Sequence, residues 1–321
     1  TDALVTLGYI NPDFLVGGAM KLDAERAGHA LDEQVCERLK ISRLEAAHGI
    51  HTIASSNMLR AVKAVSTFRG RDPRDFTLFA FGGNGPVVAM EIARELEMPR
   101  LLVPPNPGVF SALGLLCSDP EHEAQKTLFR PLSNEGATDI AKAFDQLCHE
   151  TKIRLSDDGH DPETMLLRRF ADLLYAGQAF ELTVEIANGP IASSTVTAMI
   201  TNFHQEHYRT YGHMTETAPI EMVNLRIQMR AQPRTGHEIN LATLITSPNN
   251  NHFRNRMAYF GPDIGNLDTP VLTRQQLRDK PQEGPLIVEE YDATCVIPPD
   301  YYASVDSNSN IDIRAKHERK S

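Results

Sequence analysis

Three glycines and a proline stand within five positions, at Gly82, Gly83, Gly85 and Pro86, and give the chain its clearest capacity for ligand binding. Glycine has no Cβ atom, so the backbone can turn sharply there and a bound group can approach it closely. Helix formers follow, and backbone N–H groups at a helix N-terminus can receive a phosphate, a carboxylate or a ribose. A tight strand-to-helix turn without a ligand would use the same residues. The spacing therefore leaves two alternatives, a nucleotide site and a plain turn.

The residues around this turn predict a strand, a helix and a second strand in succession. Residues 76–81 form an apolar run typical of a buried strand. Residues 89–97 are helix formers with apolar side chains at helical spacing, and residues 101–103 predict a second strand that two prolines end. The glycines would then lie against the N-terminus of a helix.

A long helix is predicted over residues 41–70, because apolar residues recur there at steps of three or four. Ser42 and Glu45 have the spacing of a capping box, and Gly70 is a natural C-terminal stop. Packed before the glycine turn, this helix would form the floor of a nucleotide site.

Two polar pairs on this helix have both a functional and a simpler interpretation. Asn57 and Arg60 can project toward a nucleotide, or they can belong to an exposed polar face. His48 and His51 lie one turn apart, which indicates surface or packing positions in preference to a metal site.

The composition indicates a soluble globular chain and argues against several partners. A length of 321 residues with 41% apolar residues suffices for two or three ordinary domains. We expect no membrane association, because no apolar run approaches about 20 residues and the N-terminus lacks a signal peptide pattern. A formal net charge of -10 would repel phosphate backbones, so no nucleic-acid partner is expected. The 4 cysteines are widely spaced, which favours a cytoplasmic location over a disulfide framework.

A second region begins after the glycine-rich segments. Its patterns predict helices over 137–155 and 194–211, and strands within 166–186 and over 220–229. Residues 233–256 predict a loop, and the segment from Gly284 onward predicts short strands. We therefore expect an α/β chain in three parts: residues 1–130, an α+β domain over 131–235, and a loop with a small C-terminal β unit over 236–321.

Several blocks, in order from Thr1 to Arg314, resemble the hydantoinase A / 5-oxoprolinase family. FAFGGNGPVVAMEIARELEMPRLLVPPNPGVFSALGLL is similar to the family's FGGxGP segment followed by PGxxSAxG. The opening TDALVTLGYINPDFLVGGAMKLD resembles a mid-chain segment of the family. LYAGQAFELTV, YRTYGHMTETAPIEMVNLR and GPLIVEEYDATCVIPPDY resemble its later blocks.

The resemblance implies part of an ATPase core similar to that of actin, sugar kinases and heat-shock ATPases. In such a core two DxGGT loops hold the phosphates of ATP and Mg²⁺, and a third glycine loop holds the adenosine. The third loop matches Gly82 to Pro86, whereas neither DxGGT loop is present in this sequence. We therefore expect residues 1–130 to be the second half of the core, within the C-terminal half of a family member. The phosphate loops would come from another polypeptide, from a cleaved precursor or from a longer chain.

Two positions depart from the family pattern. Asn84 stands where the family commonly has alanine, and Val88 stands where it commonly has histidine. Asn84 can line a sugar or base through its amide, or simply tolerate a left-handed turn. The implied adenosine-binding residues are Gly82, Gly83, Asn84, Gly85, Pro86 and, with less support, Asn57. No catalytic residue and no metal ligand is assigned.

The family uses ATP to activate a carbonyl oxygen, which implies a subunit of a cyclic-amide hydrolase of the hydantoinase or oxoprolinase type. Phosphoryl transfer of this kind depends on positioning and on charge neutralisation by magnesium. The chain alone would be inactive, and we expect a partner with the phosphate loops, a hydantoinase B-type subunit and a small-molecule substrate. The alternatives are a subunit of an ATP-dependent ketone carboxylase, of the acetone or acetophenone type, and an interaction subunit that binds no nucleotide. A further alternative is that Thr1 acts as an N-terminal nucleophile. We prefer the interpretation that Thr1 marks a processing boundary.

Overall fold

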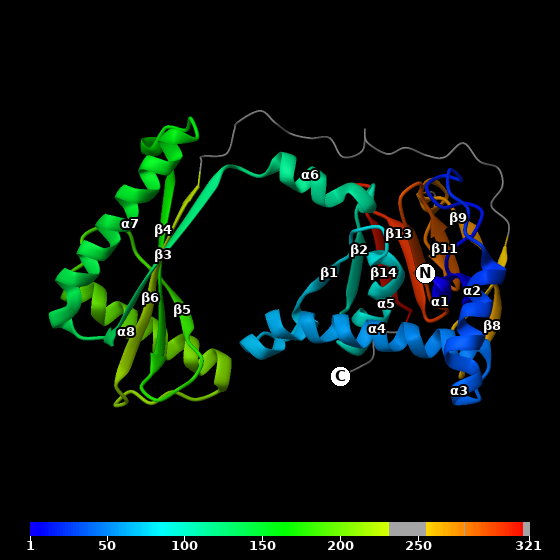
Figure 1. Ribbon diagram of the computed structural model, residues 1–321, viewed down its shortest axis with the longest axis horizontal. Helices are drawn as coiled ribbons and strands as arrows, with labels where there is room; N and C mark the ends of the chain where they lie inside the picture. The colour runs from blue at the N-terminus through cyan, green and yellow to red at the C-terminus, as the bar shows by residue number, and fades with distance from the viewer. Residues whose placement is uncertain (231–254, 279, 317–321) are drawn as a thin grey trace. The chain divides into compact units, whose positions relative to one another are not determined.

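The structure is a computed structural model that describes residues 1–230, 255–278 and 280–316 (Figure 1). The chain forms two compact units. Unit 1 contains the described residues of Thr1–Thr67, Asp72–Leu116 and Glu238–Ser321, and unit 2 contains those of Phe68–Arg71 and Cys117–His237. Most of the loop predicted over 233–256 lies outside the described residues. In the described ranges, no helix combines the length and apolar character needed to cross a membrane.

The helices of unit 1 include the long helix that the sequence predicts. Its main helices are α1 (Asp2–Thr6), α2 (Ala24–Leu31), α3 (Glu37–Leu39), α4 (Arg43–Val65), α5 (Gly85–Glu95) and α6 (Phe110–Cys117). The capping box is present, because the Ser42 hydroxyl accepts from Glu45 N–H and the Glu45 carboxylate accepts from Ser42 N–H at 2.8 Å. Helix α4 ends at Val65, before Gly70, since Ser66 leaves the helical conformation and its hydroxyl donates to the Val62 carbonyl.

A five-stranded sheet of unit 1 joins segments from both ends of the chain. Its order is β1 (Thr77–Phe79), β2 (Arg100–Val103), β14 (Ile311–Ala315), β13 (Tyr301–Val305) and β10 (Gln282–Glu283). Strands β1 and β2 are parallel, while β14 pairs antiparallel with β2, Ile313 opposite Leu101. The expected boundary at 236 therefore differs from the observed units, because the C-terminal strands complete the sheet and core of unit 1.

Two smaller sheets of unit 1 complete its core. One has the order β12 (Thr294–Ile297), β11 (Leu286–Glu289) and β9 (Val271–Leu272), and the other pairs β7 (Arg256–Tyr259) with β8 (Asn266–Thr269). Strands β11 and β12 each contribute to two apolar clusters, β11 through Val288 and Ile287 and β12 through Cys295 and Val296. Helix α5 also contributes to both clusters, and α4 packs against α5 (Figure 1).

The expectation of a buried strand over 76–81 is wrong. Strand β1 lies at the edge of the five-stranded sheet, with β2 as its neighbour, and is only three residues long. Phe76, Phe79 and Phe81 are 42%, 41% and 45% exposed, whereas Ala80 is buried. An apolar run cannot by itself distinguish an edge from a centre, because burial depends on what covers the strand.

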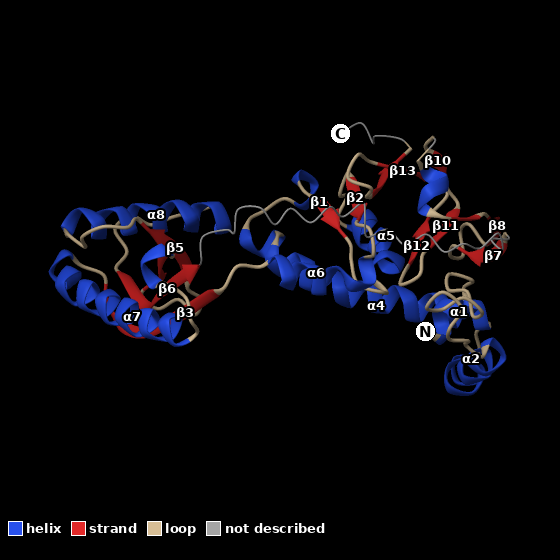
Figure 2. Ribbon diagram, turned by 90° about the horizontal axis from the view of Figure 1, so that it is seen from above, coloured by secondary structure: helices blue, strands red, loops and turns tan. Residues whose placement is uncertain are grey.

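Unit 2 contains one four-stranded antiparallel sheet and two long helices. Both helices and three of the strands lie in the predicted ranges, whereas the strand over 121–131 was not predicted. The strand order is β3 (Glu121–Pro131), β6 (Ile220–Arg230), β4 (Leu166–Tyr175) and β5 (Leu182–Ile186). Helices α7 (Ala137–Asp157) and α8 (Ser193–Tyr211) are the long helices of this unit in Figure 2. Phe144 of α7 and Phe203 of α8 are buried in one cluster with the apolar side chains of the sheet.

Candidate nucleotide site

The predicted glycine turn lies where β1 gives way to α5. Gly82 has a φ of +87°, which glycine adopts without steric cost, and its N–H donates to the Pro107 carbonyl at 2.6 Å. Helix α5 begins at Gly85, with Pro86 in its first turn. The helix therefore starts four residues earlier than the predicted range of 89–97, so the turn directly adjoins its N-terminus.

The turn is open and holds backbone donors for a ligand. A Cβ atom placed on Gly82 or Gly85 would meet no atom within 4 Å. Gly83 and Asn84 are exposed, and in the described parts of the chain their backbone N–H groups have no hydrogen-bond partner. Free N–H groups at a helix N-terminus are suited to anionic or polar groups such as a phosphate or a ribose.

Asn84 does not serve as a left-handed turn residue. Its φ is -110° and its ψ is -6°, so the left-handed interpretation is wrong, and Gly82 takes the positive φ in its place. Asn84 occupies the N-cap position of α5, yet its side chain makes no capping hydrogen bond. Its exposed amide therefore remains available to a sugar or a base.

The Pro-Gly segment after β2 lies beside the glycine turn. Asn106 has a φ of 49°, residues Pro107–Val109 form a single helical turn, and α6 follows. The hydrogen bond from Gly82 to Pro107 joins the two glycine-containing segments. The FGGxGP and PGxxSAxG blocks, separate in sequence, thus meet at one place.

A third segment, the hairpin turn between β11 and β12, contacts both glycine segments. The Asp292 carboxylate accepts the Gly108 N–H at 2.7 Å, and the Asp292 carbonyl would lie 3.4 Å from a Cβ atom on Gly83. Sequence reasoning missed Asp292 as a site residue. Local spacing could not reveal this contact, because 184 positions separate Asp292 from Gly108. The one available signal was the place of Asp292 in the GPLIVEEYDATCVIPPDY block.

A buried arginine fixes this hairpin to the end of β2. Arg274 binds both carboxylate oxygens of Glu290, at 2.6 Å and 2.5 Å. It also donates to three backbone carbonyls, those of Val103, Pro104 and Ser309. The Arg274 side chain is 4% exposed, so these bonds hold the segments in one arrangement without competition from water.

The long helix α4 places Asn57 on an exposed face. The Asn57 amide oxygen accepts a hydrogen bond from the Arg60 guanidinium, which is also exposed. Its role in a nucleotide site stays a prediction. His51, in contrast, is buried against the Tyr9 ring with centroids 5.5 Å apart, and burial lowers its pKa below the ordinary value.

Three aromatic rings cluster beside the turn. Phe110 at the start of α6 lies 5.4 Å from Phe79 and 5.5 Å from Phe81 between ring centroids. Phe79 and Phe81 are exposed despite this contact. The cluster joins the strand that enters the glycine turn to the helix that follows the Pro-Gly segment.

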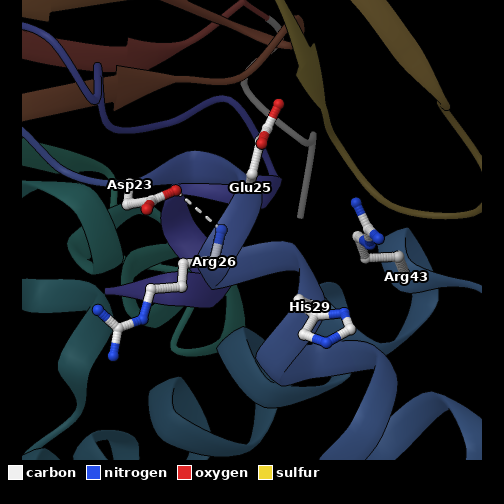
Figure 3. A pocket seen from close by; sticks show the side chains of 5 residues that line it. All are labelled: Asp23, Glu25, Arg26, His29 and Arg43. Carbon is white, nitrogen blue, oxygen red and sulfur yellow. Dashed lines mark hydrogen bonds between the residues drawn. The ribbon is translucent and has the colours of Figure 1, made fainter.

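A separate hollow of about 470 Å³ lies on the surface around α2 (Figure 3). Two of its charged side chains have partners: the Asp23 carboxylate caps α2 through Arg26 N–H at 2.9 Å, and Arg43 binds Asp32, which lies outside the lining. The Arg43 hydrogen bond lowers the pKa of the Asp32 carboxyl. The lining residues are Asp23, Glu25, Arg26, His29 and Arg43. None belongs to the predicted adenosine site.

Metal ligands do not gather anywhere in the described ranges. Among these residues no group of three or more His, Cys, Asp and Glu side chains is placed to hold a metal ion. The glycine turn itself offers amide and carbonyl groups but no carboxylate cluster.

Comparison with known proteins identifies the family. The hydantoinase/oxoprolinase family model matches residues 1–124, which include the glycine turn and the Pro-Gly segment. Caprolactamase subunit alpha of Pseudomonas jessenii is 28% identical over 99% of this chain and 46% of its own length. The chain belongs to the hydantoinase/oxoprolinase family. An uncharacterized protein of Methanocaldococcus jannaschii is 32% identical over 95% of the chain and 43% of its own length.

Other members extend the comparison to carboxylation and to the fold. The acetophenone carboxylase gamma subunit of Aromatoleum aromaticum is 28% identical over 96% of this chain and 43% of its own length. The crystal structure of the ATP-dependent caprolactamase from Pseudomonas jessenii matches with a TM-score of 0.76 and 26% identity, over 99% of this chain and 46% of that one. The expected α/β fold with part of an actin-like ATPase core is thereby confirmed. The chain spans less than half the length of these family members.

Proposed function

We propose that this chain supplies the adenosine-binding part of an ATP-dependent enzyme that hydrolyses cyclic amides. The observation that carries the proposal is the open turn at Gly82 to Pro86, where N–H groups of Gly83 and Asn84 lack partners. The similarity to an ATP-dependent caprolactamase supports ATP as the ligand of this turn. Caprolactam is a cyclic amide, as are hydantoin and 5-oxoproline.

The residues of the turn fit the polar part of a nucleotide. The free N–H groups of Gly83 and Asn84 would bind an oxygen of the ribose, and the Asn84 amide would bind the sugar or the base. Gly82 and Gly85 would keep the approach open, since side chains there would occupy it. The bound ATP supplies the phosphoryl group that activates the carbonyl oxygen of the substrate.

The phosphates and Mg²⁺ would be held outside this chain. The sequence has no DxGGT loop, and no metal-binding cluster is found among the described residues. We therefore assign both to the polypeptide that carries the phosphate loops, with a hydantoinase B-type subunit as a further partner. The chain alone should hydrolyse no ATP, and substantial turnover by the purified single chain would contradict this division of roles.

A ketone carboxylase is the second candidate. The acetophenone carboxylase gamma subunit is as similar in sequence, at 28% identity, as the caprolactamase subunit. Both reactions activate a carbonyl oxygen, but the carboxylase must capture a one-carbon acid and the hydrolase must capture water. The turn at Gly82 to Pro86 would serve either reaction, because it contacts the nucleotide and not the second substrate.

A substrate screen of the complete assembly distinguishes the candidates. We expect caprolactam, 5-oxoproline or a hydantoin to stimulate ATP hydrolysis and to yield the ring-opened acid without bicarbonate. Stimulation by acetone or acetophenone, with incorporation of labelled bicarbonate and no response to any lactam, would favour the carboxylase. No stimulation of ATP hydrolysis by either class of substrate, together with no binding of ATP in a titration, would favour an interaction subunit.

A further inference from the structure

The hairpin turn at residues 290–293 is placed to control the shape of the glycine turn. Asp292 lies on this hairpin, and its carboxylate accepts the Gly108 N–H at 2.7 Å. Gly108 follows Pro107, whose carbonyl accepts the Gly82 N–H at 2.6 Å. A chain of two hydrogen bonds therefore runs from the Asp292 carboxylate to the residue with positive φ in the glycine turn.

The contact between the hairpin and Gly108 depends on close approach. A Cβ atom on Gly108 would lie 2.8 Å from both the carbonyl oxygen and one carboxylate oxygen of Asp292, which is closer than real Cβ contacts. The Asp292 carbonyl also packs 3.4 Å from the position of a Cβ on Gly83. One residue thus lies beside the glycine turn and supports it through the Pro-Gly segment.

The hairpin itself is held on its other sides. The Glu290 N–H donates to the Ala293 carbonyl at 2.9 Å, which closes the turn, and the Glu290 carboxylate is bound by the buried Arg274. The Tyr291 ring covers Gly17, since a Cβ on Gly17 would lie 2.6 Å from it. Asp292 therefore projects from a turn whose position is fixed independently of the glycine segments.

We propose that Asp292 is a positioning residue of the nucleotide site, which fixes the Pro107–Val109 turn and through it the Gly82 peptide. A hydrogen bond to an ionised carboxylate is shorter and stronger than one between neutral groups, so this contact can impose a conformation on an otherwise exposed loop. Loss of the carboxylate would release Gly108 and, through Pro107, the hydrogen bond that orients Gly82. The proposal rests on nucleotide binding at this turn.

The test is a titration of the complete assembly with a fluorescent ATP analogue, using Asp292→Ala and Asp292→Asn. We expect Asp292→Ala to weaken binding about tenfold, because ordering the loop must then be driven by the nucleotide. Asp292→Asn should stay within about threefold of the wild type, since an amide oxygen still accepts the Gly108 N–H. The control is Asp161→Ala, which removes a carboxylate that accepts the Glu163 N–H at 3.0 Å in unit 2 and should bind normally.

A second variant disturbs the contact between Asp292 and Gly108 by changing Gly108. Gly108→Ala places a Cβ atom against Asp292 and should weaken binding as Asp292→Ala does, even if the latter folds poorly. The midpoint of urea unfolding, measured for each variant, separates lost binding from lost folding. Wild-type affinity in Asp292→Ala, or equal losses in Asp292→Ala and Asp292→Asn, would overturn the proposal. A wild-type assembly that binds no ATP analogue would instead contradict the proposed function.

Discussion

Arg274 and Glu290 form a buried ion pair, with side chains 4% and 14% exposed, that joins the hairpin before β12 to the end of β2. Arg274 satisfies its remaining donors on the carbonyls of Val103, Pro104 and Ser309. A guanidinium can make this set of bonds because its five N–H groups lie in one plane, which an ammonium group does not reproduce. The pair therefore specifies one arrangement of three segments distant in sequence.

We predict that Arg274→Lys destabilises the protein by about 3 kcal/mol, because Glu290 and several buried carbonyls lose their partners. Urea unfolding monitored by circular dichroism measures the change. The matched control is Arg168→Lys, in a pair with Glu185 whose side chains are 55% and 54% exposed. That substitution should cost less than about 1 kcal/mol, since exposed ion pairs contribute little. Equal losses in the two variants would show that burial of the Arg274 pair is not decisive.

Gly83→Val should weaken ATP binding by the assembly at least about tenfold, a difference of about 1.4 kcal/mol. The reason is that a branched side chain would stand beside the free N–H groups of the turn. We expect the variant to fold, because the added Cβ would lie 3.4 Å from its nearest neighbour, the Asp292 carbonyl oxygen. Calorimetric titration with ATP measures the affinity.

The control for Gly83→Val is Gly49→Val, on α4, where an added Cβ meets no atom within 4 Å. This variant carries the same side-chain change without touching the turn. Wild-type ATP affinity in a folded Gly83→Val assembly would remove the turn from the nucleotide site.

His51 should make the protein less stable in mild acid. Burial lowers the pKa of this imidazole below its ordinary value of 6.5, so the unfolded chain binds more protons than the folded one between the two pKa values. The contribution of His51 to stability is therefore complete above pH 6.5 and is lost as the pH falls toward the folded pKa. We expect His51→Gln to flatten this decline between pH 7.5 and about 5.5, while the exposed His149→Gln leaves it unchanged. Urea midpoints across this range test the prediction.

Asp172 should be essential to the stability of unit 2. Its carboxylate, on a side chain 5% exposed, binds Arg226 at 2.6 Å and accepts the Thr183 hydroxyl at 2.7 Å. We predict a loss of about 3 kcal/mol in Asp172→Ala, because Arg226 is left without its nearest counter-charge. Asp172→Asn should lose less, since it keeps an acceptor for Thr183. Glu185→Ala, which breaks an exposed pair, should lose less than about 1 kcal/mol, and a larger loss there would count against the argument from burial.

The sequence by itself determined the features that depend on neighbours within a few positions. The capping box of Ser42 and Glu45 forms because its partners are three residues apart, and α7, α8 and β6 follow the periodicity of their apolar residues. The strand, glycine turn and helix around Gly82 are also local, as is the order of blocks that indicates the family. Such features need only backbone hydrogen bonds and one apolar face, both of which are encoded in a short segment.

The tertiary structure alone decided what lies beside each of these elements. Strand β14 joins β2, where Arg100 and Asp312 form two hydrogen bonds of 2.9 Å across 212 positions, because the apolar faces of both strands enter one core. Strand β1 is apolar as well, yet its Phe79 is exposed, because β1 lies at the edge of the sheet with a single neighbouring strand. The contact of Asp292 with Gly108 likewise follows from packing of β11 and β12 and not from any local pattern. Burial and long-range contacts depend on which surfaces pack together, and the sequence of one segment does not specify which distant segment will pack against it.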